Sequence, residues 1–157
     1  MKKEIFFGLI ENIKYKEAKI EFEKLDALEQ EKILFDYSNQ KESLEALGFL
    51  DYLAINGWPE RKILTWYIDH LVHALCFIDG AYGLGLYYTK KLCKLEPSVE
   101  NLEKLFLFYE IPEKLLDDDM ALKVAYEILK IDETHEYAQQ IVTEIKQKQQ
   151  ALNILES

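Results

Sequence analysis

Glycine, proline and cysteine are scarce in this chain of 157 residues, which contains 6 Gly, 3 Pro and 2 Cys. So few glycines and prolines do not supply the many tight turns of a β-sandwich or barrel, whereas they suit long helices joined by short loops. The two cysteines, Cys76 and Cys93, fit a reducing cytosol, where a free thiol behaves as a small buried hydrophobe. A disulfide between them is the alternative. We therefore expect an all-α, cytoplasmic protein.

Long uninterrupted apolar runs are missing as well. The amino-terminal stretch Met1–Ile10 begins like a signal peptide, but Glu11 closes it early and no small-residue cleavage site follows. The most apolar segment, Ile63–Ile78, contains Asp69 and two histidines and is shorter than the roughly 20 residues of a membrane span. We expect neither export nor insertion into a membrane.

Positively charged residues are fewer than negatively charged ones: the chain has 19 Lys and Arg and 29 Asp and Glu, which give a formal net charge of −10. This charge opposes binding to phosphate backbones and to anionic membranes, so we expect no nucleic-acid or membrane partner. It favours a basic protein partner, and it also has the plainer interpretation that it keeps a helical protein soluble. Hydrophobic residues make up 49% of the chain, enough for one core, and we expect residues 1–157 to form a single domain.

What the chain does have is helical periodicity. From Lys62 to Ile78 apolar residues recur at intervals of four and three, which predicts one unbroken, central helix. One stripe of this helix comprises Leu64, Ile68, Leu71, Leu75 and Ile78, and the other comprises Trp66, His70, His73 and Phe77. A partner helix is predicted over Ala81–Leu95, antiparallel to the first because the loop is short. Its inward residues are expected to be Leu84, Tyr88, Leu92 and Leu95.

Helix-end signals divide the remainder. Residues 1–57 are predicted to form amino-terminal helices, one of which begins at an Asp26 cap with Glu29 three positions later. Another of these helices is expected to end at Asn56-Gly57.

A second helical hairpin is expected beyond Pro97. Three acids, Asp117, Asp118 and Asp119, open its later helix, and we interpret them as a cap and as charges at the positive end of the helix dipole. Residues 135–157 are predicted to form a capping helix, which gives about seven helices in all.

Two loop endings in the chain are alike. Lys94-Leu95-Glu96-Pro97-Ser98 aligns with Lys130-Ile131-Asp132-Glu133-Thr134 at an offset of 36 positions, 130 minus 94, near the 34-residue period of the tetratricopeptide repeat. With Gly85 and Ala121 upstream of them, these endings make residues 62–134 resemble that family. The resemblance implies helical hairpins stacked in an α–α superhelix. It also implies a protein-interaction scaffold whose first helices line a concave groove.

The densest group of chemically active side chains is Asp69, His70, His73 and Cys76. The two histidines share a helix face and Cys76 follows three residues later, so these residue types could ligate zinc. The sequence offers no fourth ligand with recognisable spacing, and the histidines share their stripe with Trp66. We therefore interpret them as packed imidazoles and expect no metal and no cofactor.

No catalytic set converges in the sequence. His73 and Cys76 lack a Gly-rich oxyanion turn, and the glycines of Gly80–Gly85 match no phosphate-binding fingerprint, so we interpret them as sites of close helix packing. We therefore do not expect an enzyme.

The function that these patterns favour is a non-enzymatic protein–protein interaction module, an adaptor or scaffold. Its partner-binding residues are expected to be aromatic or amphipathic, as binding surfaces are: Trp66, His70, His73, Tyr87 and Tyr109. Two alternatives remain open. One is an immunity or antitoxin-type protein that masks a basic toxin by complementary charge. The other is a helical metal- or small-ligand-binding protein or enzyme that uses His70, His73 and Cys76.

Overall fold

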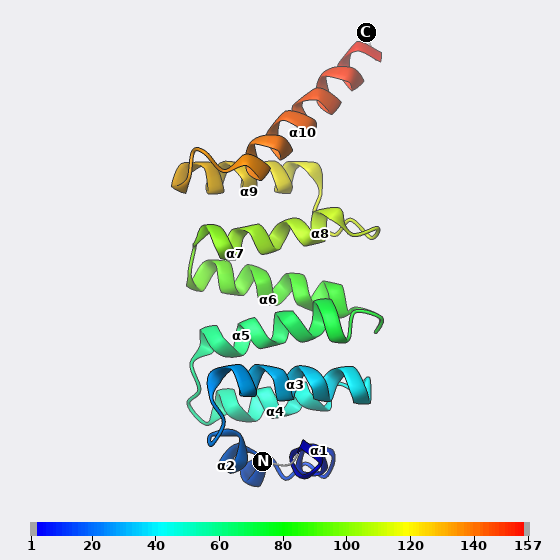
Figure 1. Cartoon of the computed structure of the whole chain (residues 1–157). Coiled ribbons are helices and arrows are strands. Elements are labelled where there is room, and N and C mark those ends of the chain that lie inside the picture. The colour runs from blue at the N-terminus through cyan, green and yellow to red at the C-terminus, as the bar shows by residue number, and fades with distance from the viewer. Residues whose placement is uncertain (1–2, 156–157) are drawn as a thin grey trace. The chain divides into compact units, whose positions relative to one another are not determined.

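The computed structural model describes residues 3–155, the last three of them by their backbone alone (Figure 1). Within this part the regular structure is helical and contains no strand, so the predicted all-α class is confirmed. The chain's internal contacts divide it into two compact units, Met1–Tyr88 and Thr89–Ser157, and the division falls inside α6 (Ala81–Leu95). Across residues 3–155, no helix has both the length and the apolar character that crossing a membrane requires.

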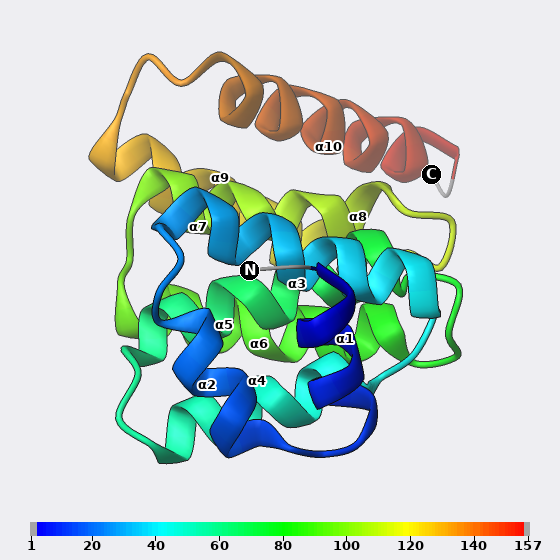
Figure 2. The same ribbon diagram turned by 60° about the horizontal axis from the view of Figure 1, so that its bottom comes forward.

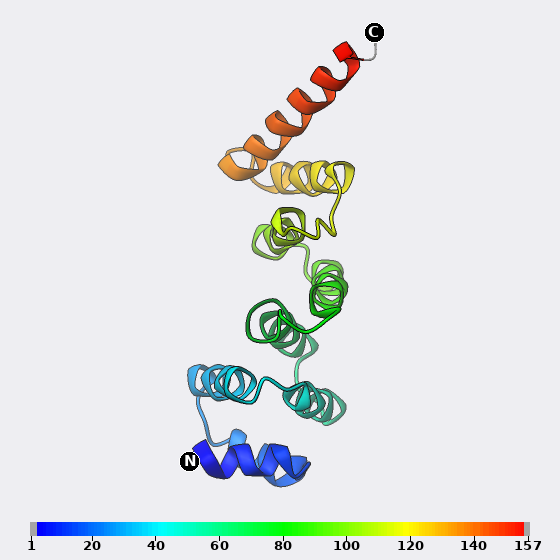
Figure 3. The same ribbon diagram turned by 90° about the vertical axis from the view of Figure 1, so that its right-hand side faces the viewer.

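The first unit is a stack of short helices. These are α1 (Lys3–Glu11), α2 (Tyr15–Phe22), α3 (Ala27–Lys41), α4 (Glu45–Ile55), α5 (Glu60–Asp69) and a π-helical turn, η1 (His70–Ala74). Helix α4 packs against α3 and α5, and η1 packs against α3. Figure 3 shows α3, α4 and α5 nearly end-on but α1 from the side, so the amino-terminal helix runs across the others. Figure 2 shows α1 and α2 in front of α4, which both of them contact.

Aromatic rings form the centre of this unit. Phe22 lies fully buried between Phe6 and Phe49, with ring centroids 5.8 and 5.4 Å away. It also meets Trp58 and Trp66 at 5.4 and 5.7 Å. Because each ring removes a large apolar area from water and these rings come from α1, α2, α4 and α5, this cluster holds the helices of the unit together.

Two predicted helix ends are confirmed. The Asp26 side chain accepts a hydrogen bond from the Glu29 backbone N–H at 2.9 Å, and the Glu29 side chain accepts one from the Asp26 N–H at 3.1 Å. This reciprocal capping box begins α3. After α4, Gly57 adopts a positive φ of +85°, which glycine adopts more readily than residues with a side chain.

The prediction of one unbroken helix over Lys62–Ile78 is wrong. Helical structure runs from Glu60 to Ala74 and includes the π turn, after which residues 75–80 form turns. The Leu75 N–H donates to the His70 carbonyl at 2.8 Å, five residues back, and so inserts one residue into the helix. Phe77, predicted to lie on a helical stripe, is in the turns that follow the helix and is 59% exposed.

Helix α6 has the predicted bounds, and part of its predicted inward face is buried. Leu92 is fully buried and Tyr88 is half-buried, as predicted, whereas Leu84 and Leu95 are 50% and 49% exposed. The other buried residues of this helix are Ala81, Gly85 and Thr89.

The second unit contains α7 (Val99–Glu103), a 3₁₀ turn η2 (Lys104–Phe106), α8 (Leu107–Glu110), α9 (Asp118–Ile131) and α10 (Glu136–Leu155). Helix α9 packs against both α7 and α10. Asp117 accepts from the Met120 N–H at 2.8 Å, so the predicted cap is confirmed, and Asp118 pairs with Lys114 at 2.8 Å. The described part holds more helical segments than the predicted seven, because α1 and α2 are separate and η2 interrupts a continuous run.

Candidate functional site

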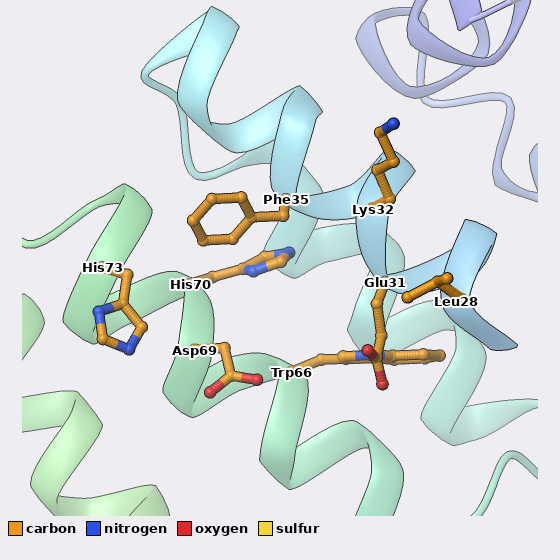
Figure 4. Close-up of a pocket in the computed structure, with 8 residues that line it drawn as sticks. All are labelled: Leu28, Glu31, Lys32, Phe35, Trp66, Asp69, His70 and His73. Atoms are coloured by element: carbon orange, nitrogen blue, oxygen red, sulfur yellow. The ribbon is translucent and has the colours of Figure 1, made fainter.

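A cavity of about 520 Å³ opens in the first unit between α3 and the α5–η1 helix. Four residues of each helix line it, as Figure 4 shows: Leu28, Glu31, Lys32 and Phe35 from α3, and Trp66, Asp69, His70 and His73 from α5–η1. Both sets follow the spacing i, i+3, i+4, i+7, so each is one continuous face of its helix. The cavity is therefore a space between two facing helix stripes.

Gln30 and Lys62 connect the two helices that border this cavity. The Gln30 amide, which is buried, donates to the carbonyl oxygens of Phe22 and Leu25 at 3.1 and 3.2 Å. Its side-chain oxygen accepts from Lys62 Nζ at 3.0 Å, which links α3 to α5. Lys62 Nζ also lies 4.9 Å from the centre of the Trp66 ring, a cation–π contact. These bonds fix the position of α3 relative to Trp66.

The inner wall of the cavity is aromatic. Trp66 is 2% exposed and His70 is 1% exposed, whereas Phe35 on the opposite helix is half-buried. The Phe35 and His70 ring centroids are 6.3 Å apart, and in Figure 4 the His70 ring extends from η1 to lie beneath the Phe35 ring. The indole of Trp66 lies on the side of Glu31 and Leu28. Flat rings thus bound the space on both sides.

The rim of the cavity is charged and accessible. Glu31, Lys32 and His73 are exposed and Asp69 is partly exposed. Leu28 exposes 74% of its surface although it is apolar. An apolar, aromatic interior beneath a polar edge is the general anatomy of a binding site.

His70 is the unusual residue of this wall. Among residues 3–155, the buried side-chain nitrogen and oxygen atoms that lack a hydrogen-bond partner are Ser38 Oγ, Trp66 Nε1 and both ring nitrogens of His70. Burial also lowers the pKa of His70 from 6.5 to about 4, because the imidazolium form loses its hydration. The ring is therefore neutral at pH 7, with one donor and one acceptor.

The structure brings together only some of the residues that the sequence picked out for partner binding. Trp66, His70 and His73 line the cavity, whereas Tyr87 lies on α6, 60% exposed, with its ring edge against Tyr88. Tyr109 belongs to α8 in the second unit. There its ring meets Lys114 and Lys148 at 4.9 and 5.8 Å.

The described part of the structure does not gather His70, His73 and Cys76 into one metal or thiol site. Within the described part of the chain, no group of three or more His, Cys, Asp or Glu residues is arranged to hold a metal ion. Cys76 follows η1 and does not line the cavity. Both cysteines are free thiols, and burial raises the pKa of Cys93 to about 11. Its thiol donates to the Asn101 carbonyl at 3.2 Å.

Sequence reasoning missed the α3 side of the cavity. Leu28, Glu31, Lys32 and Phe35 carry no motif, and three of them are ordinary exposed helix residues. These four residues have the same spacing as the four that line the cavity from α5–η1. That spacing indicates a site only once α3 and α5–η1 are known to face each other.

Comparison of the chain with protein-family models, with curated proteins and with solved structures gave no significant match. The site is therefore interpreted from its own geometry and chemistry.

Proposed function

We propose that the chain is a non-enzymatic interaction module that engages a protein partner at the cavity between α3 and α5–η1. The observation that carries this proposal is the pair of facing helix stripes with an aromatic interior and an exposed, charged rim. Peptide segments are often recognised in grooves between helices, where apolar anchors enter the groove and polar groups on the rim set orientation.

The order of the helices supports the same proposal. Helices α3 and α5 are each the first member of a consecutive pair, α3 with α4 and α5 with α6. The resemblance of residues 62–134 to tetratricopeptide repeats implies a binding groove along the first helices, and α5–η1 is the first helix of that range. Helix α3 precedes the range and faces α5–η1 across the cavity.

We propose binding rather than catalysis as the role of this wall. A general base needs a partner that orients it. In the described chain neither nitrogen of His70 has a hydrogen-bond partner.

Leu28→Lys tests the proposal. The purified full chain, immobilised, is expected to capture a defined protein from cells that express it, and Leu28→Lys is expected to abolish that capture. The physical reason is that a charge at the rim prevents an apolar anchor from entering. Ile55→Lys is the matched control, because Ile55 is an aliphatic residue of α4 that is 85% exposed.

Capture has to be retained by Ile55→Lys, and both variants have to unfold at the same temperature as the parent chain. Equal capture by the parent chain and Leu28→Lys would refute the cavity as the contact site. A failure of every variant to retain any specific protein would refute the interaction module itself.

A further inference from the structure

Three side-chain nitrogens of the described residues that line the cavity have no hydrogen-bond partner. Their donors and acceptors determine which polar group of a ligand fits the cavity. Neutral His70 carries one N–H donor and one acceptor nitrogen, and the Trp66 indole adds one more donor. Within residues 3–155 none of these three nitrogens has a protein partner, although His70 and Trp66 are 1% and 2% exposed. A buried polar group without a partner is unfavourable, so a molecule that offers partners gains affinity here.

Charged groups match this set poorly. An ammonium or guanidinium group has donors only and can pair with a single nitrogen of the three. A carboxylate has acceptors only, leaves the imidazole acceptor unpaired, and has to approach past Glu31 and Asp69 in a chain of net charge −10. Moving either charge to the buried wall also requires desolvation without an opposite charge there.

A carboxamide matches it well. Its oxygen accepts two hydrogen bonds and its NH₂ group donates two, without net charge. This pairing also does not depend on which ring nitrogen of His70 bears the proton, because the amide can meet either one. The rings of Phe35 and Trp66 offer flat faces to a flat apolar body.

We infer that the cavity between α3 and α5–η1 binds a small uncharged aromatic carboxamide through His70. The volume of about 520 Å³ lies within the roughly 300–1,000 Å³ of ordinary small-molecule sites. The inference rests on the proposed function only in using the same cavity. It names a small ligand for the space that an apolar anchor of the protein partner would enter.

Access to His70 runs past Phe35. The Phe35 ring lies above the His70 ring and is only half-buried, so its side chain turns aside without opening the core. Rotamer changes of partly exposed side chains occur on the picosecond to nanosecond timescale. Entry of a ligand therefore requires no rearrangement of the backbone.

Three ring compounds of nearly the same shape test the inference by titration of the full chain at pH 7. Benzamide is neutral, benzamidinium is a cation and benzoate is an anion. Benzamide is expected to bind at least about tenfold more tightly than either ion, the effect of one buried hydrogen bond plus avoided desolvation. Equal binding of the three, or tighter binding of an ion, would overturn the inference.

The histidines provide a readout that does not depend on any variant. The chain has three, His70, His73 and His135, so the ring ¹⁵N resonances are few enough to assign. Benzamide is expected to shift the ring nitrogens of His70 strongly and to leave those of His135, which immediately precedes α10, unchanged. A benzamide complex that leaves the His70 nitrogens unshifted would contradict the inference.

Variants then separate hydrogen bonding from packing. His70→Phe removes both nitrogens and is expected to weaken benzamide about tenfold. His70→Gln retains a donor and an acceptor and should stay within about threefold of the parent chain. His135→Phe, at a histidine of the second unit that does not line the cavity, is the matched control and should bind as the parent does. A loss in His135→Phe equal to that in His70→Phe would refute the role of His70.

A further compound tests whether the ligand needs its aromatic ring, and two further outcomes separate this inference from the proposed function. N-acetylglutamine amide carries the carboxamide without a ring, and binding as tight as that of benzamide would overturn the aromatic ligand. Failure of benzamide to bind while Leu28→Lys still abolishes partner capture would refute this inference alone. Benzamide binding in a chain that captures no protein would refute the proposed function alone.

Discussion

A histidine buried in its neutral form makes folding depend on pH. The pKa of His70 is lowered by burial from 6.5 to about 4, so the folded ring stays neutral where the unfolded ring takes up a proton. Between these two values the unfolded state binds more protons. Stability therefore falls as the pH is lowered from about 6.5 to about 4, and this group adds no further change below that.

This loss is expected to reach about 3 kcal/mol, since one pKa unit corresponds to about 1.4 kcal/mol. Urea unfolding at about pH 7.5 and about pH 4.5 measures it in the parent chain and in His70→Phe. The variant should lose less stability than the parent over this interval, because it lacks the group that titrates. An identical pH dependence in the parent and His70→Phe would show that folded and unfolded chains protonate His70 equally, which would contradict its lowered pKa.

Trp66, selected from the sequence as a binding residue, also belongs to the core. Its ring packs on Phe22 and Trp58, so most of the indole is core rather than contact surface. Only the part of Trp66 that does not pack on Phe22 and Trp58 lines the cavity. An alanine at this position would remove the core contact together with the binding wall, which is why the rim residue Leu28 is the better probe.

At the scale of the elements, glycine has opposite effects at two positions. Gly57 ends α4 with φ +85°, whereas Gly83 lies inside α6, and at both positions a Cβ would meet no atom within 4 Å. The two positions therefore differ in backbone conformation and not in available space.

Gly57→Ala is expected to destabilise the chain by about 1 kcal/mol, because an L-residue is strained in the left-handed region. Gly83→Ala is expected to stabilise it by up to about 1 kcal/mol, because alanine loses less backbone entropy in a helix. Denaturant titration of both variants beside the parent measures the difference. Shifts of the same sign would contradict the assigned conformations.

The π turn η1 decides which faces of the α5–η1 helix are presented. Up to Asp69 the helix is regular, and the stripe that begins at Trp66 follows from the sequence spacing. The hydrogen bond from Leu75 to the His70 carbonyl adds one residue to the turn. The helix ends at this turn, and Phe77, which ordinary helical spacing would place on a stripe, is in the turns beyond it and is exposed. A pattern with a fixed period cannot contain such an insertion.

At the scale of the whole molecule, the net charge of −10 affects the rate at which a charged partner associates more than the contacts it makes once bound. A basic partner would be attracted over a distance comparable to the Debye length, about 10 Å at 0.1 M salt. This is the feature that an immunity or antitoxin-type protein would need in order to mask a basic toxin. That function stays an alternative to the adaptor that we propose.

For a captured basic partner, the association rate constant is expected to fall at least about tenfold between about 20 mM and about 500 mM NaCl. The dissociation rate constant should change much less, because contacts inside the cavity are shielded from salt. Stopped-flow mixing with the purified partner measures both. An association rate that does not respond to salt would exclude charge steering and, with it, the argument for a basic partner.

The sequence by itself determined the helical class, the bounds of α6 and the caps at Asp26 and Asp117. Each of these depends on local chemistry, such as propensity, periodicity or a side chain bonding its own backbone within one turn. The sequence also singled out Trp66, His70 and His73, since unusual residues on one helix face are visible in a linear pattern.

The tertiary structure alone decided that α3 supplies the other half of the cavity, that the helix ends before Phe77, and that Leu84 and Leu95 of α6 stay exposed while Leu92 is buried. These outcomes depend on which helices face each other and how closely they approach. Such information is non-local, because steric fit between distant segments selects it among many arrangements that the same local patterns allow.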